Sequence, residues 1–307
     1  MKYISKYFSF TVVLALAIAL SCNKKDKNQK DSDTIIEGST SILVDETLLP
    51  IVEDQVSVFE NQYNAKIKLI AESEKECVID FTKDKAKIIV LPRELNPTEQ
   101  SIFKQKQIVP RTTAFAIDAL TFIKNKKSND TLINLEEVLD FIKGKHNSIK
   151  GLVFDNPNSS TVRYLCELAK VNQLPANGVF SFKTNNEVIK YVSENDGMIG
   201  VVGVNWIFQP NKESIKYLEN VNVLSVKSAK SSNYIYPSQE NIANRSYPLA
   251  RVLYIVNCQG YEGLGMGFAS FIAGEIGQRI ILTSGLAPMR EPSRNIRIRN
   301  QIENVKK

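Results

Sequence analysis

The sequence predicts an α/β fold with largely parallel sheets, and three observations support this prediction. From Thr34 onward, short apolar runs alternate with longer amphipathic stretches, which is the pattern of strands connected by helices. Hydrophobic residues make up 43% of the chain and charged residues 23%, as in ordinary globular proteins. Twice, a strand-like run leads into a cluster of small hydroxyl residues and then into a helix-like pattern.

The predicted elements follow one another without an internal repeat. Strands are expected at residues 35–36, 65–71, 86–92, 115–124, 151–155, 198–208, 220–227 and 247–257. Helices are expected at residues 41–63, 96–107, 134–144, from Ser160 onward, at 185–195 and at 265–285, with an extended tail from Ala287. Three of these helices begin with capping or first-turn residues, and the helix at 134–144 ends at Gly144.

The two hydroxyl clusters are the main candidates for a functional site. The first is Gly38, Ser39, Thr40 and Ser41, and the second is Ser159, Ser160 and Thr161. One interpretation is simple N-capping, because Ser and Thr accept hydrogen bonds from free backbone N–H groups at helix starts. The other is that two helix N-termini, each with free N–H groups and partial positive charge, hold a single anion.

The N-terminal residues predict export and a lipid anchor. Residues 1–21 combine the basic Lys2 and Lys6 with an apolar run from Phe8 to Leu20, which is typical of a signal peptide. Ser21 precedes Cys22 in a sequence that resembles a lipobox, so Cys22 is the expected lipidation site and residues 22–32 form a charged tether. A plain secretory signal with an incidental cysteine is the alternative.

Composition argues against several other classes of protein. The net charge is +6, and the basic residues are interleaved with acidic ones along the chain. No nucleic-acid partner is therefore expected. His146 is the only histidine, and no pair of cysteines has zinc-ligand spacing, so we expect no metal site, no cofactor and no catalytic residues. Beyond Cys22, the three cysteines Cys77, Cys166 and Cys258 do not form a disulfide framework, although Cys77 could pair with either of the others.

The order of segments resembles the phosphate-binding solute receptors of ABC importers, within the type II periplasmic binding proteins. The resemblance covers essentially the whole mature chain. It rests on GSTS at 38–41, on REL with a later Glu at 93–99, and on SST at 159–161. The segment YPLARVLY at 247–254 and the pattern FASFI, GQRIIL and GLAP at 268–288 complete it.

The resemblance implies two α/β lobes joined by two crossover strands, with a ligand cleft between the lobes. Lobe 1 is expected at 33–114 and 246–307, and lobe 2 at 115–245. The two hydroxyl clusters would then face each other across the cleft. The implied ligand contacts come from both lobes, and they are Ser39, Thr40, Ser41, Ser73, Arg93, Ser159, Ser160 and Thr161.

The chain departs from the family at Ser160, which stands where the family motif has glycine, and at two positions near these contacts. Asp155 stands where the family has an arginine, which removes a guanidinium that could grip an anion. Pro92 stands where family members carry the aspartate that accepts a proton from phosphate. Arg163 is a possible substitute cation, whereas Arg93 could instead pair with Glu94 or Glu99.

Three further residues in the neighbourhood of the cleft are candidates for other roles. Asp118 is expected to be structural. Asn205 and Trp206 could line the cleft, although core packing is the preferred role for the tryptophan.

The function implied by the resemblance is capture of phosphate or a related oxyanion by a membrane-anchored receptor outside the cytoplasm. An ABC permease and the membrane are the expected partners, and the chain is expected to be monomeric and not an enzyme. The alternative is a sensor or scaffold lipoprotein that kept the receptor fold and lost tight phosphate binding. Asp155 favours this alternative, because a carboxylate near the cleft repels an anion.

Overall fold

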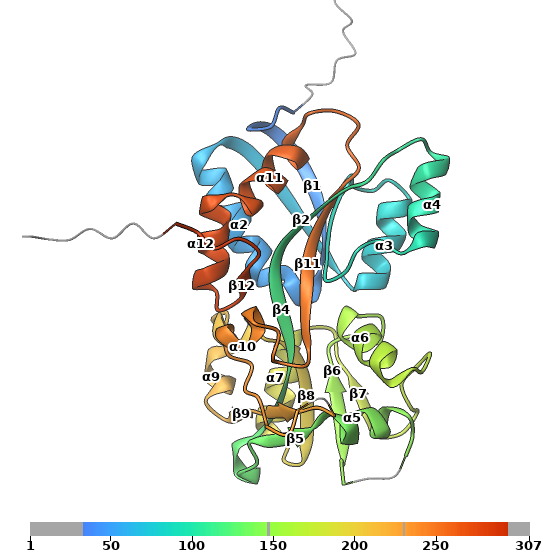
Figure 1. Cartoon of the computed structure of the whole chain (residues 1–307), viewed down its shortest axis with the longest axis vertical. Helices are drawn as coiled ribbons and strands as arrows, with labels where there is room; N and C mark the ends of the chain where they lie inside the picture. The colour runs from blue at the N-terminus through green and yellow to red at the C-terminus, as the bar shows by residue number, and fades with distance from the viewer. Residues whose placement is uncertain (1–32, 146–147, 230, 294–307) are drawn as a thin grey trace, which may run out of the picture.

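The computed structural model describes residues 33–145, 148–229 and 231–293, which form two α/β lobes stacked end to end (Figure 1). Several predictions fall on residues outside these ranges, namely the predicted signal peptide, lipidation site Cys22 and tether, together with His146 and the arginines at 294, 297 and 299. None of the helices in the described part of the chain is long and apolar enough to span a membrane.

Lobe 1 is built on three parallel strands in the order β2-β1-β3. Its strands and helices are β1 (Glu37–Asp45), η1 (Glu46–Leu48), α2 (Leu49–Gln62), β2 (Asn64–Glu72), α3 (Glu74–Thr82), β3 (Ile88–Leu91), α4 (Pro97–Gln105), α11 (Leu264–Ala273) and α12 (Glu275–Thr283). Figure 1 shows α2, α11 and α12 on one side of the sheet and α3 and α4 on the other.

Lobe 2 has parallel β6 and β7 beside β8, again with helices on both sides. Its elements are η2 (Lys126–Ser128), β5 (Leu132–Asn134), α5 (Leu135–Ile142), β6 (Gly151–Phe154), α6 (Ser160–Ala169), β7 (Val179–Ser181), α7 (Asn185–Glu194), β8 (Met198–Gly203), α8 (Asn205–Phe208), α9 (Ile215–Leu218), β9 (Val221–Val223) and β10 (Ser225–Lys227). Near the junction lie α10 (Gln239–Ala243) and β12 (Ala287–Pro288).

Two antiparallel strands, β4 (Arg111–Asn125) and β11 (Ala250–Asn257), connect the lobes. The first part of β4 pairs with β11, and its continuation from Leu120 pairs with β8 of lobe 2. β11 in turn pairs with β3 of lobe 1. This arrangement confirms the predicted two-lobed fold with two crossover strands.

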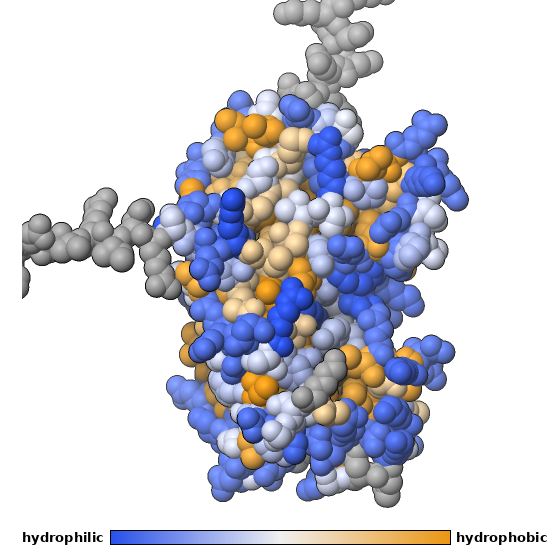
Figure 2. Space-filling view, viewed as in Figure 1, coloured by the Kyte–Doolittle hydropathy of each residue, from blue (hydrophilic) through white to orange (hydrophobic). Residues whose placement is uncertain are grey.

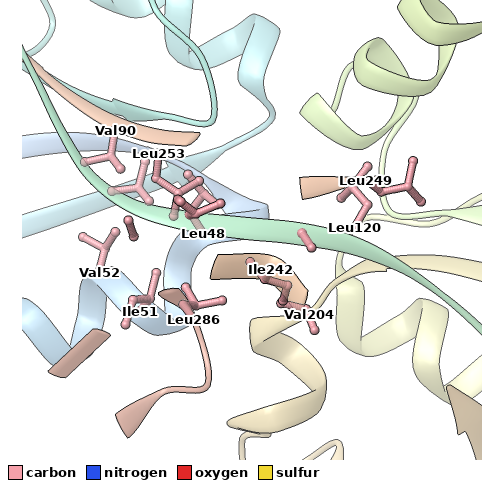
Figure 3. Close-up of a cluster of buried hydrophobic side chains, with 14 of the residues drawn as sticks. Leu48, Ile51, Val52, Val90, Leu120, Val204, Ile242, Leu249, Leu253 and Leu286 are labelled. Carbon is pink, nitrogen blue, oxygen red and sulfur yellow. The ribbon is translucent and has the colours of Figure 1, made fainter. Parts of the chain in front are cut away.

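One hydrophobic core continues through the junction along β4. Figure 3 shows Leu48 and Val90 of lobe 1 on one side of this region and Leu120 and Val204 of lobe 2 on the other. A second cluster fills the α3–α4 face of lobe 1, and a third fills the α7 face of lobe 2. Residues Ile42, Leu43 and Val44 alternate between the first and second clusters, as a strand with two covered faces requires.

Two predicted helices have different boundaries in the structure. The segment expected to be a helix from Ser41 to Tyr63 begins as strand, and its helix starts only at Leu49. The fully buried, strand-favouring run from Ile42 to Val44 explains this, because it extends β1 between two partner strands. The helix expected at 265–285 is two helices, α11 and α12, separated at Gly274.

Candidate functional site

The carboxyl ends of the lobe 1 strands form one wall of the cleft. β1 ends at Asp45, which caps η1 by accepting hydrogen bonds from the backbone N of Thr47 at 3.2 Å and from Thr47 Oγ1 at 2.8 Å. Pro50 then lies in the first turn of α2. The turn Asp45–Glu46–Thr47 is thus the junction between strand and helix that faces lobe 2.

Ser39, Thr40 and Ser41 do not lie at this junction, which corrects the prediction for the first hydroxyl cluster. They are inside β1, where they pair with Lys66, Ile67 and Lys68 of β2. Ser39 is exposed, and it precedes Asp45 by six strand positions, or about 20 Å at about 3.3 Å per residue. The two predicted clusters therefore do not converge. The overlooked signal was the sequence Asp45-Glu46-Thr47 directly before a helix with an early proline.

The second hydroxyl cluster lies where it was predicted, at the junction between β6 and α6. Ser159 is the N-cap of α6: its Oγ accepts from the backbone N of Val162 at 3.3 Å and donates to Asp155 Oδ1 at 2.7 Å. Ser160 and Thr161 form the first turn and are fully buried. Ser160 Oγ lies 3.2 Å from Thr47 Oγ1 across the cleft. Ser159 thus has the capping role, while Ser160 faces lobe 1.

The crossover strands place a buried ion pair beside the first turn of α6. Arg251 on β11 and Asp118 on β4 are register partners. Arg251 donates to Asp118 Oδ2 from Nε at 3.1 Å and from Nη2 at 2.9 Å, and its Nη1 donates to Ser160 Oγ at 3.1 Å. Asp118 thus has the structural role that was predicted, because it orients Arg251.

Arg251 was not among the predicted ligand contacts, although the sequence contained a signal for it. Arg251 and Asp118 each interrupt an apolar strand, in YPLARVLYIVN and FAIDALTFIK. A single charge in a buried strand requires a partner, so each residue predicts the other.

Buried carboxylates dominate the rest of the cleft. Burial raises the pKa of Asp45, with the charge of Glu74 adding to the effect. Burial and the neighbouring Asp155 raise the pKa of Glu46 to about 8. Burial also raises the pKa of Asp155 to about 6, against the opposing hydrogen bond from Ser159. Of these carboxyl groups, Glu46 is therefore mostly protonated at neutral pH and can donate a hydrogen bond.

Several buried polar atoms of this cleft have no hydrogen-bond partner in the described structure. These atoms are Asp45 Oδ2, Asp118 Oδ1, Thr161 Oγ1 and Asn205 Oδ1. Buried polar atoms are rarely left unpaired, so a small polar ligand that both donates and accepts hydrogen bonds suits this set. Among the residues described, no group of three or more His, Cys, Asp or Glu is arranged to hold a metal ion.

Direct hydrogen bonds between the lobes hold the cleft closed. Trp206 Nε1 on α8 donates to the Thr47 carbonyl at 2.9 Å, and Asn205 Nδ2 donates to the same oxygen at 3.2 Å. Gln209 of lobe 2 also donates to Asp54 on α2. Trp206 is 3% exposed, so it both packs in the core of lobe 2 and lies at the interface between the lobes.

The predicted contacts Ser73 and Arg93 belong to one rim of the cleft. Ser73 Oγ donates to Glu76 Oε2 at 2.7 Å at the start of α3. Arg93 donates to both carboxylate oxygens of Glu99, at 2.7 and 2.9 Å, and to Glu74 Oε1 at 2.7 Å. The predicted alternative for Arg93, an ion pair with Glu99, is therefore present. Both side chains are committed to partners within lobe 1.

Glu74 links the two lobes at this rim. Its side chain is 4% exposed and accepts from Arg93 of lobe 1 and from Arg163 Nε of lobe 2, at 2.7 and 3.0 Å. Outside this link lies a groove of about 820 Å³ between α3–α4 and α6, which opens at the right edge of the molecule in Figure 2. Arg163 thus serves the contact between the lobes rather than replacing the family's arginine in the cleft.

Replacing Glu74 by Ala should lower the free energy of unfolding by about 1–3 kcal/mol, because it removes charge-assisted hydrogen bonds to two arginines. Urea unfolding measures the effect. The matched control is Glu167→Ala, which removes the exposed partner of the same Arg163 and should cost less than about 1 kcal/mol. Equal losses in the two variants would show that Glu74 does not join the lobes.

Comparison with known proteins decides the family. Residues 28–275 match the family model described as PBP superfamily domain. The chain belongs to the PBP superfamily. This membership agrees with the two lobes, the two crossover strands and the site at the carboxyl ends of parallel strands.

Individual members of this superfamily resemble the chain over most of its length. The phosphate-binding protein PstS of Borreliella burgdorferi is 26% identical over 297 residues, covering 89% of this chain and 96% of the relative. An ABC transporter substrate-binding protein assigned to phosphate, solved with bound phosphate from Clostridium perfringens, is 18% identical with a TM-score of 0.68, covering 82% and 100% of the two chains. An ABC-type phosphate transport receptor from Vibrio cholerae is 17% identical with a TM-score of 0.61, covering 82% and 100%.

The three cysteines of the described chain are buried free thiols. Burial raises the pKa of each of them, so they are poor thiolates. The possible disulfide involving Cys77 is therefore absent from the structure.

Proposed function

We propose that this protein is a solute-binding protein that captures phosphate between its lobes for an ABC-type importer. The observation that carries the proposal is the convergence of Thr47, Ser160 and Arg251, which come from lobe 1, lobe 2 and a crossover strand. A ligand bound among them contacts all three parts and so favours the closed state. The phosphate-binding PstS of Borreliella burgdorferi and the Clostridium perfringens protein with bound phosphate support this choice of ligand.

Phosphate suits this cleft better than an oxyanion without protons. Arg251, Thr47, Ser160 and Thr161 supply donors, and the first turn of α6 adds backbone N–H groups and a partial positive charge. Asp45 has an unpaired buried oxygen that needs a donor. A phosphate proton can fill that need, whereas fully ionised sulfate has none. Asp45 thus offers a proton acceptor although Pro92 occupies the position where the family carries one.

The acidic residues of the cleft change how phosphate binding depends on pH, but they do not prevent it. The carboxyl groups of Glu46 and Asp155 have raised pKa values in the closed cleft. Protonated carboxyls are neutral and can donate to phosphate oxygens. We therefore infer that Asp155, which stands in place of the family's arginine, contributes as a partly protonated acid.

The cellular location that we propose for this protein is inferred from its N-terminal sequence. We propose that residues 1–21 direct export, that acyl chains on Cys22 attach the protein to a membrane, and that residues 22–32 act as a tether. The two lobes would then face the periplasm or the exterior as a monomer and deliver phosphate to a permease. A binding role without catalysis fits a cleft of hydroxyl groups, carboxyls and one arginine.

Isothermal titration of the mature domain with phosphate, sulfate and molybdate tests the proposal. We expect one phosphate site per chain and weaker binding of sulfate, because sulfate provides no proton to Asp45. Thr47→Val should weaken phosphate binding about 5- to 100-fold, the effect of losing one or two hydrogen bonds to a charged ligand. The control Thr40→Val, inside β1, should leave it unchanged. No binding of any of the three anions would overturn the proposal.

A further inference from the structure

Two carboxylates from opposite lobes meet beside the proposed phosphate site. Glu46 follows β1 in lobe 1, and Asp155 follows β6 in lobe 2. The Nδ2 group of Asn185, the first residue of α7, donates to Glu46 Oε2 at 2.8 Å and to Asp155 Oδ2 at 3.4 Å. One amide group thus bridges the two acids across the closed cleft.

The orientation of this bridging amide is fixed by its other hydrogen bonds. The backbone N of Gly203 donates to Asn185 Oδ1 at 3.4 Å, so the oxygen faces β8 and Nδ2 faces the carboxylates. Asn185 is fully buried. The backbone N of Asn185 also donates to Glu46 Oε1 at 3.4 Å. Asp155 also accepts from Ser159 Oγ at 2.7 Å, so Asn185 Nδ2 is the donor that the two acids have in common.

The charges around the pair do not neutralise it. Asp45, at the end of β1, is another carboxylate and acts on both Glu46 and Asp155. Arg251 on β11 is bonded to Asp118 of β4 and to Ser160 of α6.

The remaining acidic side chains nearby are occupied elsewhere. On α7, Glu187 accepts from the backbone N of Thr184 and so caps its own helix. On α3, Glu74 is paired with two arginines. Among the residues that the structure describes, no lysine or arginine forms an ion pair with Glu46 or Asp155, and a low-dielectric site with two carboxylates disfavours the doubly ionised state.

We propose that Glu46 and Asp155 hold one proton between them when the lobes close, so that closure on phosphate takes up a proton from solvent. This inference rests on the proposed function for the identity of the ligand. Closure of the lobes with proton uptake does not depend on that identity. In an open cleft both carboxylates face water and ionise at ordinary pH. Closing brings them together beside Asn185, and one of them becomes a neutral acid that can donate a hydrogen bond.

The direction of the pH effect follows from the raised pKa values. Burial and Asp155 raise the pKa of Glu46 to about 8, and burial raises that of Asp155 to about 6. The closed state therefore binds more protons than the open state between the ordinary carboxyl pKa values and pH 8. Closure is accordingly favoured at low pH and is weakened as pH rises through 6 to 8.

The first test measures the protons taken up with phosphate. Titration calorimetry at pH 7 in two buffers of different ionisation enthalpy should show about one more proton taken up by the native protein than by Glu46→Gln. Comparison with this variant removes the contribution of phosphate's own protons. The control Glu219→Gln, an exposed site in lobe 2, should match the native protein. Equal uptake in native protein and Glu46→Gln would overturn the inference while leaving phosphate binding intact.

The second test needs no ligand, because Trp206 reports closure. It is the only tryptophan of the chain, and its Nε1 bonds to Thr47 of the other lobe. Acrylamide quenching of its fluorescence should increase between pH 6 and 9 in the native protein and stay nearly flat in Glu46→Gln. Asp155→Asn provides a second variant should Glu46→Gln fail to fold.

Matching quenching profiles for the native protein and both variants would contradict proton-linked closure. If the quenching profiles are as predicted but the protein binds no phosphate, the proposed ligand is refuted and proton-linked closure is retained. The two proposals can therefore fail separately.

Discussion

Replacement of Arg251 by Met is expected to abolish phosphate binding and to lower the free energy of unfolding by about 3–5 kcal/mol. The reason is that Asp118, which is fully buried, loses the partner that neutralises it, and breaking a buried ion pair on one side costs this much. Ser160 loses its charged donor at the same time. Denaturant unfolding measures the stability, and calorimetry measures binding.

A double variant separates the two effects of Arg251. Arg251→Met combined with Asp118→Asn removes both charges and should recover most of the lost stability, while phosphate binding stays absent. Native affinity in the folded double variant would show that Arg251 takes no part in binding the anion.

Replacement of Ser160 by Leu is expected to weaken phosphate binding about 10- to 100-fold. Ser160 is fully buried with its Oγ 3.2 Å from Thr47 Oγ1, so a larger side chain overpacks the interface and holds the lobes apart. Calorimetric titration measures the affinity, and circular dichroism confirms that the variant is folded.

The control for Ser160→Leu is Ser39→Leu, which changes the hydroxyl that the sequence placed on the opposite wall of the cleft. Ser39 is exposed within β1, so this variant should bind phosphate as the native protein does. A similar loss of affinity in both variants would indicate that the site includes the start of β1, contrary to the structure.

Local sequence patterns were sufficient to predict the α/β class and the strand-to-helix junction on the lobe 2 side of the cleft, whereas the two-lobed architecture was implied by the family resemblance. This junction consists of the buried strand Gly151–Phe154, the N-cap Ser159 and the amphipathic helix α6. It could be predicted because the interactions that determine it lie within a few residues of one another. The two crossover strands were implied by the resemblance to the type II periplasmic binding proteins; their length would not have shown them, since β11 has 8 residues and β1 has 9.

The prediction placed the lobe 1 side of the cleft at the wrong end of β1, because a hydroxyl-rich cluster and an acidic one flank the same buried run. Ser39–Ser41 precede the buried run and Asp45–Thr47 follow it, and only the pairing of β1 with β2 and β3 shows which end faces lobe 2. Arg251 was missed for a related reason. Its role depends on its register with Asp118, which lies 133 residues away.

A crystal structure of the protein grown with phosphate tests the central claim most directly. The account predicts a tetrahedral anion in the cleft, within hydrogen-bond distance of Thr47, Ser160 and Arg251 and with one oxygen facing Asp45. Phosphate bound outside this cleft, or a closed cleft containing none at saturating concentration, would contradict it.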